Sequence, residues 1–492
     1  MRGHLFIYCL FLLILCPSGA WARVIHVPEE APTIQGGIDL AEAGDTVLVA
    51  PGRYSESEID FRGKSIRVTG ADPGNLDVVA GTVIDANTSG RVFYFHSGED
   101  TTSVLAGMTI TGGYTGYWGG GIRCSYSSPR IESMIVAGNE AAYGGGGIWC
   151  EYANPTIVNS VIIANTAAWG GGGIRCTSSS PSIARNIIGG NSAAYGGGVD
   201  CHYSSAPTIS NNVIAENHAL SGGGVYAYEH SSPLVTNNTI TRNVADELGG
   251  AIMSKGFSSP VVVNSILWGD SAGLGREIVV GGSQDPSALT VRYSDVEGGL
   301  ISVYTDPWCT IDWGEGIIDA EPMFVDGTYH LKSGSPCADS GDPSMADACR
   351  PPGLQGVRGD MGAFGGESNC WWPQEGLYFS LLSAGLTSVP RGGTLSCRAY
   401  IHNIEGHPVD GNFWLSVLLP DSTEILIPRV VLNHDNPMSG VVQAFGSESF
   451  SVELSIPMAV ETGFYTLIGR IGSYPNLVVD EERIAFEVIE GN

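Results

Sequence analysis

Charged and aromatic residues recur at one position of a repeated motif. The motif begins with glycines and continues with Ile or Val, one variable residue and, in four copies, Cys. The variable residues are Arg123, Trp149, Arg175, Asp200, Tyr226 and Met253. Aromatic rings stack on the C–H faces of sugars, and charged side chains bind hydroxyl or carboxylate groups. A row of such residues pointing outward predicts a polysaccharide-binding face. The alternative is a plain surface on which a stacked column tolerates any residue.

Acid–base catalysis is a second interpretation of the same face. The position after the cysteine column holds Ser125, Glu151, Thr177, His202 and Tyr228. Paired carboxylates near a basic group cleave polysaccharides. Glu151, Asp200, His202 and Arg175 would therefore be catalytic if they converged in a groove. The chain has no Asp-Asp pair, P-loop, nucleophile elbow or zinc motif. We favour binding without catalysis, with a polysaccharide lyase or glycoside hydrolase, or a structural spacer, as alternatives.

These residues are positioned by a repeat of about 26 residues. The repeat appears as columns of identical residues: Asn139, Asn165, Asn191, Asn217 and Asn243, and Cys124, Cys150, Cys176 and Cys201. Within each unit the apolar residues alternate with a period of two, in pieces of three to five residues broken by Gly, Asn, Ser and Pro. This pattern predicts short strands with tight corners. Stacking the units gives an all-β parallel solenoid.

The repeated columns have predicted structural roles. The cysteines should face inward beside the Ile/Val column, where neighbouring strands are close enough for a disulfide; stacked free thiols are the equal alternative. The asparagines should form a ladder of amide hydrogen bonds along the axis. A third column, at a corner, is predicted to be a stacking ladder rather than a ligand platform; it consists of Tyr117, Tyr143, Trp169 and Tyr195.

The units resemble those of right-handed parallel β-helix proteins with a pectate-lyase-like fold. "GGGI" followed by "IIAN" (162–165), "IGGN" (188–191) or "IAEN" (214–217) is similar to the repeats of polymorphic outer-membrane proteins, although this chain has Ile or Val where those have Phe. The segments 25–56 and 321–366 resemble the opening and closing coils of such proteins. The resemblance implies a β-helix of ten to twelve coils over residues 23–368, covered at its start by a short helix capped by Thr33. It implies no particular activity, because this fold hosts enzymes, adhesins and spacers.

The flanking segments indicate export and a second domain. Residues 1–22 have a basic start, an apolar run and small residues before Arg23, as in a signal peptide, which predicts a secreted or cell-surface protein. Residues 369–376 are predicted to be a linker. Residues 377–492 contain longer alternating strands, which predicts a small Ig-like β-sandwich.

The charge balance limits the partners. There are 51 acidic and 23 basic residues, a formal net charge of −28, which disfavours nucleic acid. A polysaccharide or cell-surface component is the predicted partner. No cofactor is expected, although four aspartates in the closing coils could hold calcium or simply cap turns: Asp339, Asp342, Asp347 and Asp360.

Overall fold

The computed structural model describes residues 22–282, 284–324, 329–331, 335–345, 359–365 and 391, and the backbone of ten strands between 377 and 489. The predicted linker and all but the last residue of the predicted signal peptide lie outside the described residues. In the part of the chain that is described, no helix is long and apolar enough to cross a membrane.

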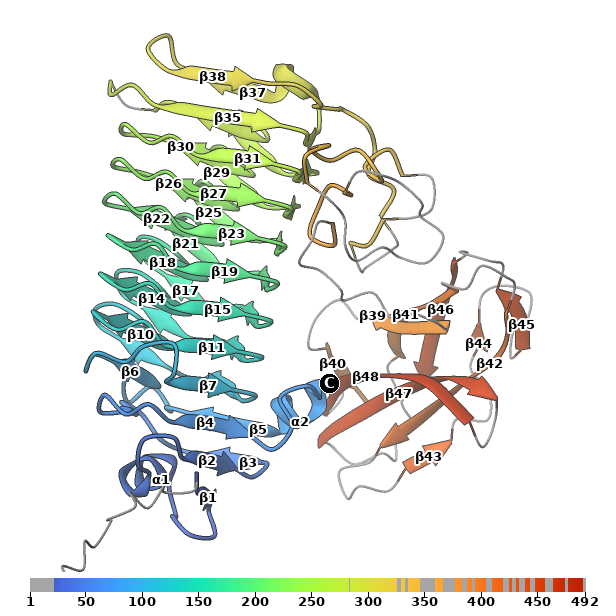
Figure 1. Ribbon diagram of the computed structural model, residues 1–492. Helices are drawn as coiled ribbons and strands as arrows, with labels where there is room; N and C mark the ends of the chain where they lie inside the picture. Colours follow the sequence, from blue (N-terminus) through green and yellow to red (C-terminus); the bar gives the residue numbers. More distant parts are fainter. Residues whose placement is uncertain are drawn as a thin grey trace, which may run out of the picture.

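A parallel β-solenoid forms the rod seen in Figure 1. Each full coil visits four sheets in turn, and every strand pairs with its counterparts in the coils before and after it. The twelve-stranded first sheet agrees with the predicted ten to twelve coils. It consists of β1 (Val24–Val27), β2 (Thr46–Val49), β4 (Arg67–Gly70), β7 (Val104–Ala106), β11 (Arg130–Glu132), β15 (Thr156–Val158), β19 (Ser182–Ala184), β23 (Thr208–Ser210), β27 (Leu234–Thr236), β31 (Val261–Val263), β35 (Ala288–Arg292) and β38 (Thr310–Trp313).

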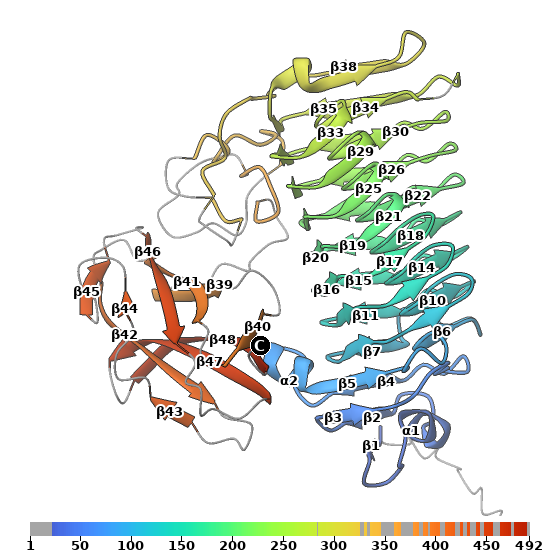
Figure 2. The same ribbon diagram turned by 180° about the vertical axis from the view of Figure 1, so that it is seen from behind.

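The second sheet follows the first after a tight corner in each coil. It consists of β3 (Gly52–Tyr54), β5 (Thr82–Asp85), β8 (Thr109–Thr111), β12 (Ile135–Ala137), β16 (Val161–Ile163), β20 (Ile187–Gly189), β24 (Val213–Ala215), β28 (Thr239–Thr241), β32 (Ile266–Trp268) and β36 (Asp295–Val296). The third sheet is narrower and is visible from behind in Figure 2. It consists of β9 (Tyr114–Thr115), β13 (Glu140–Ala141), β17 (Thr166–Ala167), β21 (Ser192–Tyr195), β25 (His218–Ser221), β29 (Val244–Leu248) and β33 (Ser271–Leu274).

The fourth sheet carries the glycine–cysteine motif. It consists of β6 (Phe93–Phe95), β10 (Ile122–Ser125), β14 (Ile148–Glu151), β18 (Ile174–Thr177), β22 (Val199–His202), β26 (Val225–Ala227), β30 (Ile252–Ser254), β34 (Ile278–Val280) and β37 (Val303–Thr305). Equivalent motif residues are aligned in register, so that Cys124 pairs with Cys150 and Cys150 with Cys176. Residues that share a column in the sequence therefore lie next to one another along the rod.

The short helix α1 (Ile34–Leu40) covers the first coil, as the sequence predicts (Figure 1). The hydroxyl of Thr33 accepts a hydrogen bond from the Gly36 backbone N–H (3.0 Å), which caps the helix. Ile34 and Ile38, which lie on the inner side of this helix, are fully buried and close the apolar end of the solenoid. Two further short helices, α2 (Leu76–Gly81) and η1 (Gly299–Ser302), lie in connections between strands.

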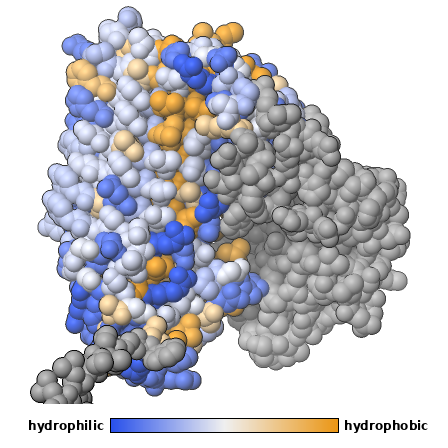
Figure 3. All heavy atoms as spheres, viewed as in Figure 1, coloured by the Kyte–Doolittle hydropathy of each residue, from blue (hydrophilic) through white to orange (hydrophobic). Residues whose placement is uncertain are grey.

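The interior of the rod is a continuous column of Ile, Val, Leu, Phe and Cys side chains. Figure 3 shows that the side of the rod facing the viewer is mostly hydrophilic, with a narrow lengthwise band of apolar residues. Cys124, Cys150, Cys176 and Cys201 are fully buried in the core and are free thiols. The disulfide alternative is therefore not found among the described cysteines. The hydrogen bond with the Cys124 thiol, together with burial, raises the pKa of Cys150 well above its ordinary value, and the hydrogen bond with Cys176 opposes this rise.

Runs of three or four neighbouring glycines precede five strands of the fourth sheet, β10, β14, β18, β22 and β26. Gly145 has φ +66°, a left-handed conformation that glycine adopts without strain. A Cβ at Gly147 would lie 2.6 Å from the carbonyl oxygen of Gly173 in the next coil. The glycines thus allow both the corner and the close approach of successive coils.

The asparagine column is a ladder of hydrogen bonds. The side-chain NH₂ of each member donates to the side-chain oxygen of the next at 2.9–3.0 Å, as from Asn165 to Asn191 and from Asn191 to Asn217. A parallel ladder of buried polar residues runs beside it and was not predicted; its members are Ser160, Asn186, Asn212, Asn238 and Ser265.

Beyond the solenoid, ten strands pair in two sheets, mostly antiparallel. They are β39 (Leu377–Leu382), β40 (Thr387–Pro390), β41 (Thr394–Asn403), β42 (Val409–Leu418), β43 (Glu424–Leu426), β44 (Val431–Leu432), β45 (Ser439–Val442), β46 (Ser447–Ser455), β47 (Gly463–Ser473) and β48 (Leu477–Ile489). The Ig-like β-sandwich expected from the sequence for residues 377–492 remains a prediction.

Candidate functional site

The row of variable residues on the fourth sheet lies outside the apolar core, yet most of it is closed to solvent. Trp149, Arg175, Asp200 and Tyr226 occupy consecutive, register-paired positions. Their exposed fractions are 3%, 7%, 1% and 3%, whereas Arg123 is half-buried. A polymer in solution cannot contact side chains that are covered to this extent.

The row is closed because its side chains stack on one another and a corner of the coil folds over them. The Arg123 guanidinium lies 4.4 Å from the centre of the Trp149 ring. The indole N–H of Trp149 donates to the Thr177 hydroxyl (3.1 Å). Gly144 passes over Arg175, whose Cδ would lie 2.7 Å from a Cβ at that glycine. The glycines at this corner therefore let the backbone cover the row.

The predicted catalytic cluster does not assemble. Arg175 pairs with Asp200 (Nη1 to Oδ2, 3.1 Å), and burial raises the pKa of Asp200 to about 6, a rise that the Arg175 charge opposes. Glu151 instead pairs with Arg123 (3.0 Å), and His202 lies 3.5 Å from Glu229. None of Arg175, Asp200, His202 and Glu151 lines the groove described next. The four residues are spread over a packed surface.

A different row of side chains is exposed, at the turn that follows the fourth sheet. Its members occupy equivalent positions in six successive coils, three residues before the proline column: Tyr126, Tyr152, Ser178, Ser204, His230 and Phe257. We call these six residues the turn row. All six have left-handed backbone conformations, with φ between 47° and 64°. Tyr126, Tyr152 and Phe257 are 68%, 54% and 46% exposed.

Bulky residues are unusual in this backbone conformation and cost free energy there. Another left-handed column of the same coils is occupied mainly by asparagine, as at Asn159, Asn211 and Asn237. In the turn row, aromatic rings stand at strained positions and gain little burial.

The rings of the turn row form two stacked pairs separated by a gap. The Tyr126 and Tyr152 ring centres are 5.0 Å apart with an interplanar angle of 14°, and those of His230 and Phe257 are 4.9 Å apart with an angle of 4°. Ser178 and Ser204 occupy the two coils between the pairs. Three coil steps of about 4.8 Å separate the Tyr152 and His230 turns, roughly 14 Å in all.

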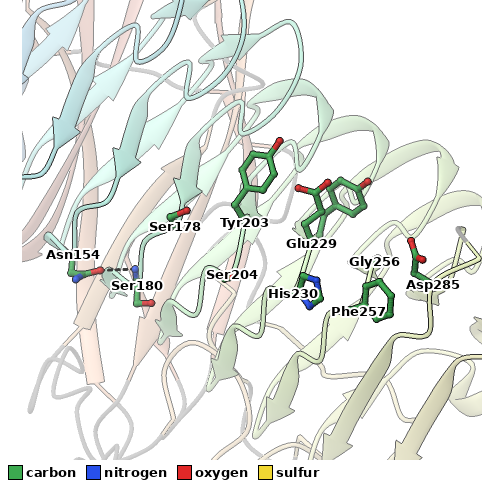
Figure 4. Close-up of a pocket in the computed structure, with 11 residues that line it drawn as sticks. Asn154, Ser178, Ser180, Tyr203, Ser204, Glu229, His230, Gly256, Phe257 and Asp285 are labelled. Atoms are coloured by element: carbon green, nitrogen blue, oxygen red, sulfur yellow. Dashed lines mark hydrogen bonds between the residues drawn. The ribbon is translucent and has the colours of Figure 1, made fainter.

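An open groove of about 670 Å³ runs along this part of the rod. Its lining comes from successive coils: Asn154, Ser178, Ser180, Tyr203, Ser204, Tyr228, Glu229, His230, Gly256, Phe257 and Asp285. Figure 4 shows these residues following one another along the axis, with His230 and Phe257 aligned. The backbone N–H of Ser180 donates to the side-chain oxygen of Asn154 (2.6 Å), which fixes one end of the groove.

The turn row is not among the site residues predicted from the sequence. The fixed spacing to the proline column was a usable signal, but "CSYSSP", "CHYSSAP" and "AYEHSSP" differ in length, which obscures the equivalence. The corner residues Tyr117, Tyr143, Trp169 and Tyr195 are 37–67% exposed, and a stacked contact joins Tyr117 to Tyr143 (6.4 Å). They lie at the corner between the third and fourth sheets and do not line the groove.

The aspartates of the closing coils bind backbone groups. Asp342 accepts hydrogen bonds from the backbone and hydroxyl of Ser344 (2.8 and 2.7 Å), and Asp360 accepts one from the Asp339 backbone (2.7 Å). Asp347 lies outside the described residues. Among the residues that the structure describes, no group of three His, Cys, Asp or Glu side chains is placed to hold a metal ion.

Comparison with known proteins identifies the class of fold. Residues 92–267 and 191–305 match a family described as "Right handed beta helix region". The solenoid is a right-handed parallel β-helix. No curated protein sequence matches the chain.

Two solved structures show limited similarity. One is a family 123 glycoside hydrolase from Clostridium perfringens (12% identity, TM-score 0.19, 23% of this chain and 27% of that chain). The other is a β-glucosidase from Listeria innocua in complex with glucose (13% identity, TM-score 0.18, 42% of this chain and 31% of that chain). The chain thus covers less than a third of either protein, and neither similarity bears on its function.

Proposed function

We propose that the protein is an exported, non-catalytic β-helix that holds a polysaccharide along the groove beside the turn row. The observation that carries the proposal is the pair of ring stacks at strained, exposed turn positions on either side of Ser178 and Ser204. Sugar rings would fill the gap against the open faces of Tyr152 and His230. The polysaccharide would run parallel to the axis, since the groove crosses successive coils. Export rests on the predicted signal peptide, and we assign the C-terminal strands to a domain that holds the rod at a surface.

Binding is favoured over catalysis because the four acid–base residues predicted from the repeat, Glu151, Arg175, Asp200 and His202, are each paired with a neighbouring side chain. Asp200 is 1% exposed and paired with Arg175, so it cannot reach a substrate. A spacer without any ligand would not need aromatic residues at turn positions that cost free energy.

The test uses a variant in which aromatic side chains fill the gap in the turn row. The double variant Ser178→Tyr/Ser204→Tyr would continue the ring stack through the groove. The turns can hold tyrosine, because Tyr126 and Tyr152 have φ of 54° and 47° and the two serines 50° and 58°. We expect the variant to fold and to lose at least tenfold in affinity for a polysaccharide bound by the native protein, measured on a glycan array and then by calorimetry.

Tyr117→Ala is the matched control, since Tyr117 is exposed to 67% at a corner outside the groove. It should leave binding unchanged. Unaltered binding by the filled variant, or failure of every glycan to bind the native protein, would refute the proposal. Release of shortened sugars during the assay would establish the enzyme alternative.

A further inference from the structure

The groove is acidic. Its lining includes the carboxylates of Glu229 and Asp285 and contains neither lysine nor arginine, and its one basic side chain is His230. The chain as a whole carries a formal charge of −28, so the long-range field around the site also attracts cations and repels anions. An acidic polysaccharide would bring its carboxylates against these groups.

Among the residues that the structure describes, no lysine or arginine forms an ion pair with Glu229. The closest basic side chain in contact is His202, whose Nε2 lies 3.5 Å from Glu229 Oε2. Burial lowers the pKa of His202 to about 4, and the Arg175 charge adds to this effect, so that the imidazole is neutral near pH 7. Glu229 itself is one-third exposed toward the groove, where a ligand can reach it.

One ring of the groove, that of Tyr228, already contacts an ammonium group of the chain itself. The Nζ of Lys255, which is not part of the lining, lies 5.7 Å from the centre of the Tyr228 ring. This contact is a cation–π arrangement of the kind in which ammonium groups bind to aromatic faces. Tyr203, Tyr228 and Phe257 line the groove together with the two carboxylates. Rings and carboxylates together form a suitable environment for protonated amines.

We infer that the groove selects an amine-bearing polysaccharide, one built from sugars with free amino groups. The inference rests on the proposed function and specifies its ligand. The hydroxyl and amide groups of Ser178, Ser180 and Asn154 face the same groove and suit sugar hydroxyls. A sugar chain uses these groups and the ring faces as well as the charge, whereas a basic peptide uses mainly the charge.

The experiment compares oligosaccharides of equal length on the full-length mature protein by calorimetry. The probes are a β-1,4-linked glucosamine hexamer, its N-acetylated counterpart and a galacturonic acid hexamer, with hexalysine as a peptide control. The measurements are made at about pH 5.5, where the sugar amines are protonated. We expect the amine hexamer to bind at least tenfold more tightly than the acetylated one, and the acidic hexamer not to bind.

The variant Glu229→Gln should abolish the preference for the amine hexamer and leave the affinity for the acetylated hexamer unchanged. Glu247→Gln, an equal charge change at an exposed residue of β29, should leave the preference intact. If Glu229→Gln alters the fold, Asp285→Asn gives the same test.

Equal affinities for the amine and acetylated hexamers, or tighter binding of the acidic hexamer, would overturn the inference and leave the proposed function standing. Hexalysine binding as tightly as the amine hexamer would also overturn it. If neither these hexamers nor any other glycan tested bound to the native protein, the proposed function itself would be refuted.

Discussion

Replacing Asp270 by asparagine should stabilise the rod at alkaline pH. Asp270 ends the asparagine ladder, and its Oδ1 accepts hydrogen bonds from the backbone and side chain of Asn243 (2.7 and 2.8 Å), as each asparagine oxygen does for its predecessor. Burial raises the pKa of Asp270 from its ordinary 3.8 to about 7. Burial and the neighbouring Asp270 raise the pKa of Glu277 even further. Two buried carboxyl groups therefore meet at this point, where the rest of the ladder has neutral amides.

The sign and size of the effect follow from the raised pKa. The folded protein holds the proton of Asp270 more tightly than the unfolded chain, so stability is lost as the pH rises from about 4 to about 7. At about 1.4 kcal/mol per pKa unit, the full penalty above pH 7 is on the order of 4 kcal/mol. Asp270→Asn keeps the ladder acceptor and removes this titration.

We expect the variant to be more stable than the native protein by about 2–4 kcal/mol near pH 8 and to gain little near pH 4. Urea and thermal unfolding of the solenoid, followed by circular dichroism at both pH values, would measure this. Glu247→Gln is the control for removal of an exposed charge. No gain near pH 8, or an equal gain at both pH values, would refute the reasoning.

Three other changes test the interior and the closed row. Asn191→Ala removes four buried hydrogen bonds: two with Asn165, one with Asn217 and one with the Ile162 carbonyl. The free energy of unfolding should fall by about 4 kcal/mol in a denaturant titration, and a fall below about 1 kcal/mol would contradict the ladder. Gly144→Ala should lower the melting temperature by several degrees, because its Cβ would meet Arg175; an unchanged melting temperature would argue against the closed corner. The buried core thiols, exemplified by Cys150, should react with a thiol reagent only after unfolding, and fast labelling in the native protein would contradict their burial.

The parts of the structure that depend on the repeat were predictable from the sequence. Strand positions, register, coil number and the buried cysteine and asparagine columns all follow from residues that recur at fixed intervals. The outward residues Arg175 and Asp200 lie beside one another, as the repeat spacing predicts, but their burial depends on the path of the Gly144 and Gly170 corners across the sheet. That path is a tertiary property, which period-two alternation does not encode.

The turn row was missed for a related reason. Its side chains share a backbone conformation, a feature that the types of Tyr152 and Ser178 do not reveal. The gap becomes visible only when the rings are stacked in space, because it consists of the two coils in which serine occupies the turn-row position.

The uniform coil makes the length of the groove an adjustable quantity. Each coil contacts only its neighbours, so duplicating or deleting one unit leaves the remaining contacts in place. Inserting one coil between Ser178 and Ser204 would move the two ring stacks apart by about 4.8 Å. A change in the number of coils could therefore match the proposed site to longer or shorter ligand segments without altering any side chain.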